Sequence, residues 1–96
     1  MLKNITGREA RMLLENHAKV IDIRDKSEFH RSHLKGSLNI EPQDVENVLN
    51  IYPDKNTVLI VVCASGIRSI AVAEMLTDLG YKEVYNLLGG YDEYFR

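Results

Sequence analysis

The sequence predicts an α/β protein built around a mostly parallel sheet. Short segments rich in β-branched residues alternate along the chain with segments of helical periodicity, as in folds that pack helices against a parallel sheet. Residues 58–62 are five consecutive branched aliphatic residues, which is typical of a strand buried on both faces. The length of 96 residues corresponds to one domain. We therefore expect residues 1–96 to form a single domain, with helices on both faces of the sheet.

Two capping boxes mark the expected starts of the first two helices. Thr6 and Glu9 are spaced so that the hydroxyl can accept from the amide of the third helical residue, while the carboxylate reaches back to the N-cap amide. This spacing predicts a helix over about residues 7–16. Asp25 and Glu28 repeat the spacing and predict a second, shorter helix.

Runs of β-branched residues and one proline predict the elements between these helices and the central strand. Residues 20–23 and, more weakly, residues 37–40 have the composition of short strands. Pro42 suits the first position of a helix, where its missing amide has no cost. The apolar positions of that helix would be Val45, Val48 and Leu49.

The second half of the chain predicts one long helix and a last strand. The helix follows Gly66 and ends at Gly80, a residue typical of the C′ position. Residues 84–87 predict the last strand, and a short terminal helix follows Gly89 and Gly90. The inward-facing positions of the long helix would be Val72, Met75, Leu76 and Leu79.

Composition and charge exclude several classes of protein. Hydrophobic residues make up 45% and charged residues 27% of the chain, which are the proportions of a soluble globular domain. The formal net charge of −2 gives no attraction to nucleic acid or to an anionic membrane. The longest apolar run is far shorter than the ~20 residues of a membrane span, and the N-terminus lacks the apolar core of a signal peptide. We expect a cytoplasmic protein whose partners include neither nucleic acid nor membrane.

The only cysteine, Cys63, lies where a ligand site is expected. It directly follows the central strand, and open α/β sheets bind their ligands at the carboxyl ends of strands. Amides of the next loop and helix would point at the sulfur, and Arg68 would add a cation; both effects lower the pKa of a thiol from ~8.5. Gly66 lets the loop turn tightly, and the small residues after the cysteine would leave the pocket open. The expected binding loop is Ala64, Ser65, Gly66, Ile67, Arg68 and Ser69.

Two plainer interpretations compete with a catalytic one. A lone cysteine at the end of a buried strand is more often a small apolar residue than a nucleophile, and Arg68 could simply point to solvent. A cation at a helix N-terminus opposes the helix dipole, however, and this cost favours an anion-binding role. The three histidines are widely spaced, so we expect no metal site. We interpret His33 as a packed loop residue.

Several segments resemble the rhodanese-like domain family, in the same order and with the same spacing. The loop Cys63-x-x-Gly66-x-Arg68-Ser69 after an aliphatic strand resembles the active-site loop of that family. The other matching segments are residues 20–24, 28–29, 33–40, 71–76, 80–81 and 84–90. The resemblance covers nearly the whole chain.

The resemblance implies a sulfurtransferase. In this family the loop cysteine, here Cys63, takes a sulfane sulfur from a donor such as thiosulfate and holds it as a persulfide. It then passes the sulfur to a thiol or to cyanide, which is covalent nucleophilic catalysis. The thiol acceptor would be a small thiol or a thioredoxin-like protein, and no metal or organic cofactor is needed.

The resemblance also implies a fold and a set of supporting residues. The implied fold is a three-layer sandwich with a five-stranded, mostly parallel sheet, whose additional strand lies near residues 3–5. Asp22, Arg24 and Glu28 would be structural, because buried charges need partners. Within this group we expect Arg24 to pair with Glu28.

The sequence leaves three other functions open. One is a persulfide carrier loaded by a partner protein, because a loop with Arg68 as its one basic residue attracts dianionic thiosulfate only modestly. A phosphatase or arsenate reductase is disfavoured, because the Cys-x4-Arg loop is one residue shorter than the Cys-x5-Arg loop of the related dual-specificity phosphatases. A non-catalytic interaction module is disfavoured because such domains usually lack the cysteine that this chain has.

Overall fold

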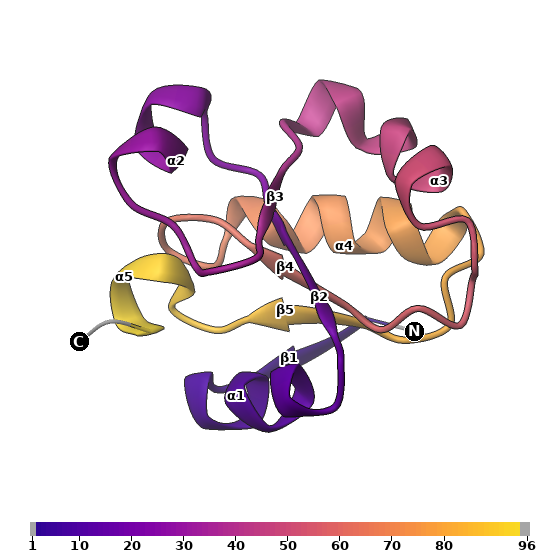
Figure 1. The fold of residues 1–96 in the computed structure, drawn as a ribbon, viewed down its shortest axis with the longest axis horizontal. Coiled ribbons are helices and arrows are strands. Elements are labelled where there is room, and N and C mark those ends of the chain that lie inside the picture. Colours follow the sequence, from indigo (N-terminus) through magenta and orange to yellow (C-terminus); the bar gives the residue numbers. More distant parts are fainter. Residues whose placement is uncertain (1, 95–96) are drawn as a thin grey trace.

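The computed structural model describes residues 2–94 and contains a five-stranded sheet between two layers of helices (Figure 1). The strand order is β1-β5-β4-β2-β3, and each of these pairings is parallel. This arrangement confirms the predicted α/β fold class. The elements in chain order are β1 (Leu2–Ile5), α1 (Gly7–Glu15), β2 (Lys19–Asp22), α2 (Lys26–Arg31), β3 (Leu38–Asn39), the 3-10 helix η1 (Pro42–Asn47), α3 (Val48–Ile51), β4 (Leu59–Val62), α4 (Arg68–Asp78), β5 (Val84–Leu87) and α5 (Gly90–Tyr94).

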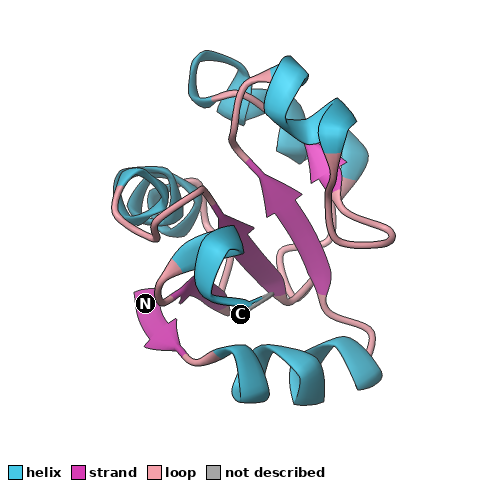
Figure 2. Ribbon diagram, turned by 90° about the vertical axis from the view of Figure 1, so that its left-hand side faces the viewer, coloured by secondary structure: helices cyan, strands magenta, loops and turns pink. Residues whose placement is uncertain are grey.

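The middle strand, β4, divides its side chains between two apolar layers. All four of its residues are buried, and successive side chains of a strand point to opposite faces. Leu59 and Val61 join the layer that contains side chains of α4, η1 and α3, whereas Ile60 and Val62 join the layer that contains Ala10 of α1. Figure 2 shows the sheet between α1 and the other helical layer. Each such buried side chain contributes about 1.5–3 kcal/mol, so the strand that leads into the cysteine is held from both sides.

Both predicted capping boxes are present. The Thr6 hydroxyl accepts from the Glu9 amide at 3.2 Å, and the Glu9 carboxylate accepts from the Thr6 amide at 3.1 Å. This backbone hydrogen bond lowers the pKa of Glu9. Asp25 caps α2 in the same way, with its carboxylate 2.9 Å from the Glu28 amide. Local spacing was therefore sufficient to predict both helix starts.

Two helical details differ from the prediction. The helix expected after Pro42 is a 3-10 helix followed by the short α3, with a non-helical residue at Asp44. Its buried residues Val45 and Val48 are three positions apart, which places them on one face of a helix with three residues per turn. In α4, Met75 was expected to face inward but is 44% exposed, because it lies outside the face of the helix that packs on the sheet. The buried residues of α4 are Ser69, Val72, Ala73 and Leu76.

Candidate active site

The loop that follows β4 turns sharply at the carboxyl edge of the sheet. Gly66 has a φ of +85°, a left-handed conformation that favours glycine. A Cβ at this position would lie 2.8 Å from the Gly89 amide nitrogen and 2.8 Å from the Leu87 carbonyl oxygen. The loop therefore packs directly on the backbone that follows β5, and a larger residue at this position would push it away.

The start of α5 fixes the loop from the other side. The amide of Tyr91 donates to the Cys63 carbonyl at 2.8 Å, and the amide of Asp92 donates to the Ala64 carbonyl at 3.1 Å. Gly90 permits this approach, since a Cβ there would lie 2.4 Å from the Cys63 carbonyl oxygen. With these carbonyls bound to α5, the following amides of the loop are free to face the sulfur.

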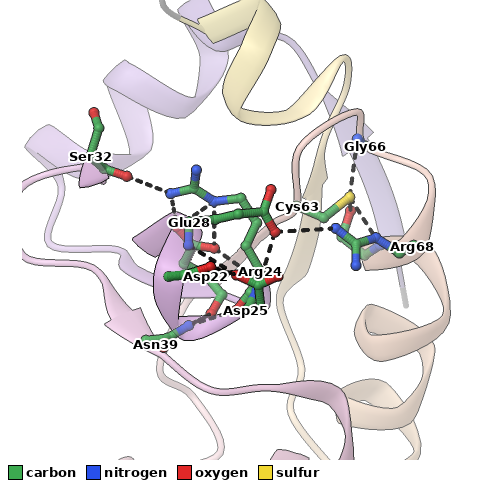
Figure 3. A network of polar contacts seen from close by, with 11 residues as sticks. Asp22, Arg24, Asp25, Glu28, Ser32, Asn39, Cys63, Gly66 and Arg68 are labelled. Carbon is green, nitrogen blue, oxygen red and sulfur yellow. Dashed lines mark hydrogen bonds and ion pairs between the residues drawn. The ribbon is translucent and has the colours of Figure 1, made fainter. Parts of the chain in front are cut away.

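Three hydrogen bonds join the Cys63 sulfur to its own loop and to the start of α4. The sulfur accepts from the amide of Gly66 at 3.1 Å, as Figure 3 shows. It also accepts from the amide of Ser69 at 3.4 Å, and the thiol donates to the Ser69 hydroxyl oxygen at 3.3 Å. We call these groups, together with the Ser65 amide, the cradle. Of the six loop residues that the sequence predicts around Cys63, three therefore contribute to the cradle: Ser65, Gly66 and Ser69.

The cradle makes the Cys63 thiol more acidic than an ordinary one. Burial alone would raise the pKa of this thiol, because it disfavours the charged form. The hydroxyl and amide of Ser69 and the amides of Gly66 and Ser65 outweigh burial, and the net pKa is lowered. A thiol with this environment supplies more thiolate at neutral pH, and the thiolate is the nucleophilic form.

Asn86 of β5 supports the cradle, a role that was not predicted from the sequence. Its side-chain oxygen accepts from the Ser69 hydroxyl, and its amide group donates to the Gly66 carbonyl at 3.0 Å and to Asn4 of β1 at 2.9 Å. Asn86 is fully buried. A signal was available, because an amide at an inward position of an otherwise apolar strand needs hydrogen-bond partners.

Asp22 and Arg24 form a buried ion pair at the end of β2. The Asp22 carboxylate accepts from the backbone amide, Nε and Nη2 of Arg24, with the shortest distance 2.7 Å. The Arg24 guanidinium also donates to the Ser32 carbonyl at 2.7 Å and lies 3.9 Å from the ring centre of Tyr91. The hydrogen bonds with Asp22 raise the pKa of Arg24.

The expected pairing of Arg24 with Glu28 is therefore wrong. Asp22 lies only two residues before Arg24, and its carboxylate accepts from the backbone amide of Arg24 as well as from its guanidinium. The Glu28 carboxylate instead lies 4.0 Å from Nη2 of Arg68 (Figure 3). We call Glu28 and Arg68 the rim, because both side chains are partly open to solvent next to the cradle, with exposed fractions of 26% and 59%.

Cys63 itself is enclosed. Its exposed fraction is 0%, whereas Ile67 in the same loop is 72% exposed. The expectation that small residues leave an open pocket over the sulfur is thus wrong for this structure. Ala64 is half-buried and Ser65 is exposed, but their small size leaves no opening to the sulfur. A reactant must displace groups around the loop to reach the sulfur.

Comparison with known proteins decides the family. Residues 6–96 match the rhodanese-like domain family. The chain belongs to that family. Among its relatives are proteins named thiosulfate sulfurtransferase GlpE from Haemophilus influenzae, 34% identical over 94 residues (98% of this chain and 89% of the relative), and from Pseudomonas aeruginosa, 36% identical over 90 residues (94% and 81%). A rhodanese-like domain protein from Staphylococcus aureus has a similar structure, with a TM-score of 0.84, 28% identity and coverage of 96% and 90%.

Because the chain belongs to this family and has relatives named thiosulfate sulfurtransferase, its enzyme class is that of a sulfurtransferase of rhodanese type. Membership of the family also explains the fold, because the structure of the Staphylococcus aureus protein matches nearly the whole chain. The additional strand that the resemblance implied is β1. Within residues 2–94, no helix is long and apolar enough to cross a membrane.

The remaining candidate groups lie outside the cradle of this rhodanese-like chain. His33 is exposed and stacks on Phe29, with ring centres 3.8 Å apart, and its Nδ1 contacts the Phe29 carbonyl at 2.8 Å. It packs within its loop as predicted, and the hydrogen bonds of the Cys63 sulfur go to other residues. No cluster of three or more potential metal ligands occurs among the described residues.

Proposed function

We propose that this sulfurtransferase carries sulfane sulfur on Cys63, taking it from thiosulfate or from a persulfide and delivering it to a thiol or to cyanide. The observation that supports this proposal is the cradle, in which three backbone amides and one hydroxyl surround a thiol of lowered pKa. Its donors suit a sulfur anion, both the thiolate before reaction and the persulfide after it.

In the first step, the Cys63 thiolate attacks the outer sulfur of thiosulfate. A new sulfur–sulfur bond forms to Cys63, the sulfur–sulfur bond of thiosulfate breaks, and sulfite leaves with the bonding electron pair. The three negative charges of the reactants remain as one on the persulfide and two on sulfite. Because the thiol is already acidic, the step needs no general base.

In the second step, an acceptor thiolate attacks the outer sulfur of the Cys63 persulfide. The bond to Cys63 breaks, Cys63 leaves as a thiolate, and the acceptor carries the persulfide away; cyanide reacts in the same way to give thiocyanate. Small thiols and thioredoxin-like proteins are the acceptors we propose, and the chemistry uses neither a metal nor an organic cofactor. Such reactions suit the reducing cytoplasm, where we place the protein.

A persulfide carrier loaded by a partner protein is the second candidate. Two features favour it: Glu28 lies beside the loop cation Arg68, and the sulfur is enclosed. Both slow the entry of a small dianion, whereas docking of a protein could rearrange the loop. Phosphate chemistry is less favoured, because the short loop from Cys63 to Arg68 surrounds a single sulfur atom more closely than it would a phosphate.

Intact mass spectrometry tests the proposal. The reduced protein and Cys63→Ser are each incubated with thiosulfate and, separately, with glutathione persulfide. We expect the wild type to gain the mass of one sulfur atom, which cyanide then removes, and Cys63→Ser to gain none. Loading from the persulfide alone would favour the carrier. Equal gain in Cys63→Ser, or no gain from either donor, would overturn the proposal.

A further inference from the structure

We propose that Glu28 is a specificity-determining residue, whose carboxylate disfavours dianionic sulfur donors relative to donors of lower charge. The inference rests on the proposed function, because it concerns the donors that reach Cys63. It starts from the rim, where the Glu28 carboxylate lies 4.0 Å from Nη2 of Arg68. Arg68 directly precedes Ser69, whose amide contacts the sulfur. The Glu28 carboxylate therefore partly neutralises Arg68, the cation that is adjacent in sequence to the cradle.

Two guanidinium groups near the cradle, those of Arg24 and Arg68, each have a carboxylate partner among the described residues. Arg24 is fully engaged by the buried Asp22 carboxylate. Glu28 offsets Arg68, and the exposed Asp25 beside it adds a further negative charge. A dianion that approaches the rim thus meets two guanidinium groups that are each already paired with a carboxylate.

The position of Glu28 is fixed by its helix. It is the third residue of α2, and its carboxylate accepts from the Asp25 amide at 3.4 Å in the capping box. This contact orients the side chain toward Arg68, as Figure 3 shows. Glutamine also serves at this capping position. The variant Glu28→Gln therefore removes the charge and keeps the helix start.

Coulomb's law sets the expected size and the pattern of the effect. Across about 6–10 Å of water, one charge changes the local concentration of a monoanion by about two- to threefold. The interaction is proportional to the charge of the ligand, so a dianion should feel roughly the square of that factor, about four- to ninefold. Salt should reduce both effects, because the screening length falls to ~3 Å at 1 M.

The decisive experiment compares alkylation of Cys63 by iodoacetate, an anion, and by iodoacetamide, a neutral molecule of nearly the same size. Their rate ratio cancels changes in thiolate fraction and in opening of the loop. We expect Glu28→Gln to raise the iodoacetate-to-iodoacetamide ratio about two- to threefold and Arg68→Gln to lower it. Glu15→Gln, which removes a charge from the exposed end of α1, is the matched control and should leave the ratio unchanged.

The same variants are then loaded with thiosulfate. We expect Glu28→Gln to raise the second-order rate of loading about four- to ninefold at low salt and much less at 1 M salt. An unchanged ratio and unchanged loading in Glu28→Gln, with normal loading of the wild type, would overturn this inference alone. Failure of the wild type to gain sulfur from any donor would overturn the proposed function, and with it the donor-selecting role of Glu28.

Discussion

Two neighbouring strands, β2 and β4, each end in a buried polar network, and the two networks differ in what they leave available. At the end of β2, the Asp22 carboxylate and the Arg24 guanidinium satisfy each other, with the remaining guanidinium contacts made to Ser32 and Tyr91. At the end of β4, the donors of the cradle surround Cys63, whose thiol is neutral until it loses its proton. The charges of the Asp22–Arg24 network are paired with each other, whereas the donors of the cradle have an anionic partner only when the Cys63 sulfur is charged.

In the function that we propose, this difference separates a polar site that supports the structure from one that takes part in the chemistry, at the same edge of one sheet. Closed charge pairs such as Asp22–Arg24 hold loops in place, and Asn39 extends this pair to β3 by donating to the carbonyls of Asp22 and Arg24 at 3.1 and 2.9 Å. In the function that we propose, the cradle instead stabilises a negative charge on the sulfur during the reaction, which is the arrangement that catalysis by preorganised donors requires.

The largest expected effect breaks the closed network. Asp22→Ala leaves the Arg24 guanidinium buried without its carboxylate, so we expect the free energy of unfolding to fall by about 3–5 kcal/mol. Urea denaturation measures this loss. The pH midpoint of Cys63 alkylation in the folded fraction should stay where it is in the wild type, since Asp22 makes no contact with the cradle.

Two controls bracket this result. Asp78→Ala, at an exposed position of α4, should change stability by less than about 0.5 kcal/mol. The double variant Asp22→Leu/Arg24→Met removes both charges and should recover part of the loss. A single variant as stable as the wild type would show that the pair does not hold the end of β2.

A smaller effect is expected from loosening the cradle. Asn86→Leu removes the acceptor of the Ser69 hydroxyl and the donor to the Gly66 carbonyl, so we expect a loss of about 1–3 kcal/mol. The midpoint of Cys63 alkylation should move up toward that of an ordinary thiol, because the donors are no longer held on the sulfur. Asn50→Leu, at an exposed position of α3, is the control. An unmoved midpoint would limit Asn86 to a structural role.

The smallest effect concerns the pH dependence of stability. Because the pKa of Cys63 is lowered in the folded protein, the unfolded chain binds more protons between that pKa and ~8.5. The free energy of unfolding should therefore rise with pH across this window, by at most about 1.4 kcal/mol per pH unit, and the contribution should be lost as pH falls through the folded pKa.

This pH dependence is measured as the difference between the wild type and Cys63→Ser in urea denaturation at several pH values. Ser69→Ala removes the cradle hydroxyl and should raise the pKa of Cys63 in the folded protein. The pH range over which stability rises should therefore begin at a higher pH. A constant difference between wild type and Cys63→Ser would mean that folding does not acidify the thiol.

The sequence predicted most of what local spacing determines. Both capping boxes, the buried central strand and the position of Cys63 after it follow from residues close together in the chain. The partner of Arg24 was missed because family resemblance places groups near one another without choosing between two carboxylates. The structure makes this choice, because the Asp22 carboxylate binds both the backbone amide and the guanidinium of Arg24.

The role of Asn86 was missed for a different reason. Its partners come from the loop after β4 and from β1, and the pairing of Asn4 with Asn86 in the sheet register joins segments at opposite ends of the sequence. Such contacts depend on the strand order, which periodicity does not give. The enclosed state of Cys63 likewise depends on α5, whose amides hold the loop carbonyls.

The hydrogen bond between Asn4 and Asn86 spans 82 positions of the sequence, and this separation links reactivity to folding. Contacts between distant segments carry a large loop-closure entropy and tend to form late. A partly folded chain, in which β5 has not yet joined the sheet, would carry an ordinary thiol rather than an acidic one. The pKa of the thiol is thus lowered only when the sheet is assembled, so a partly folded chain should carry less thiolate at neutral pH. Pulse alkylation during refolding would follow this maturation directly.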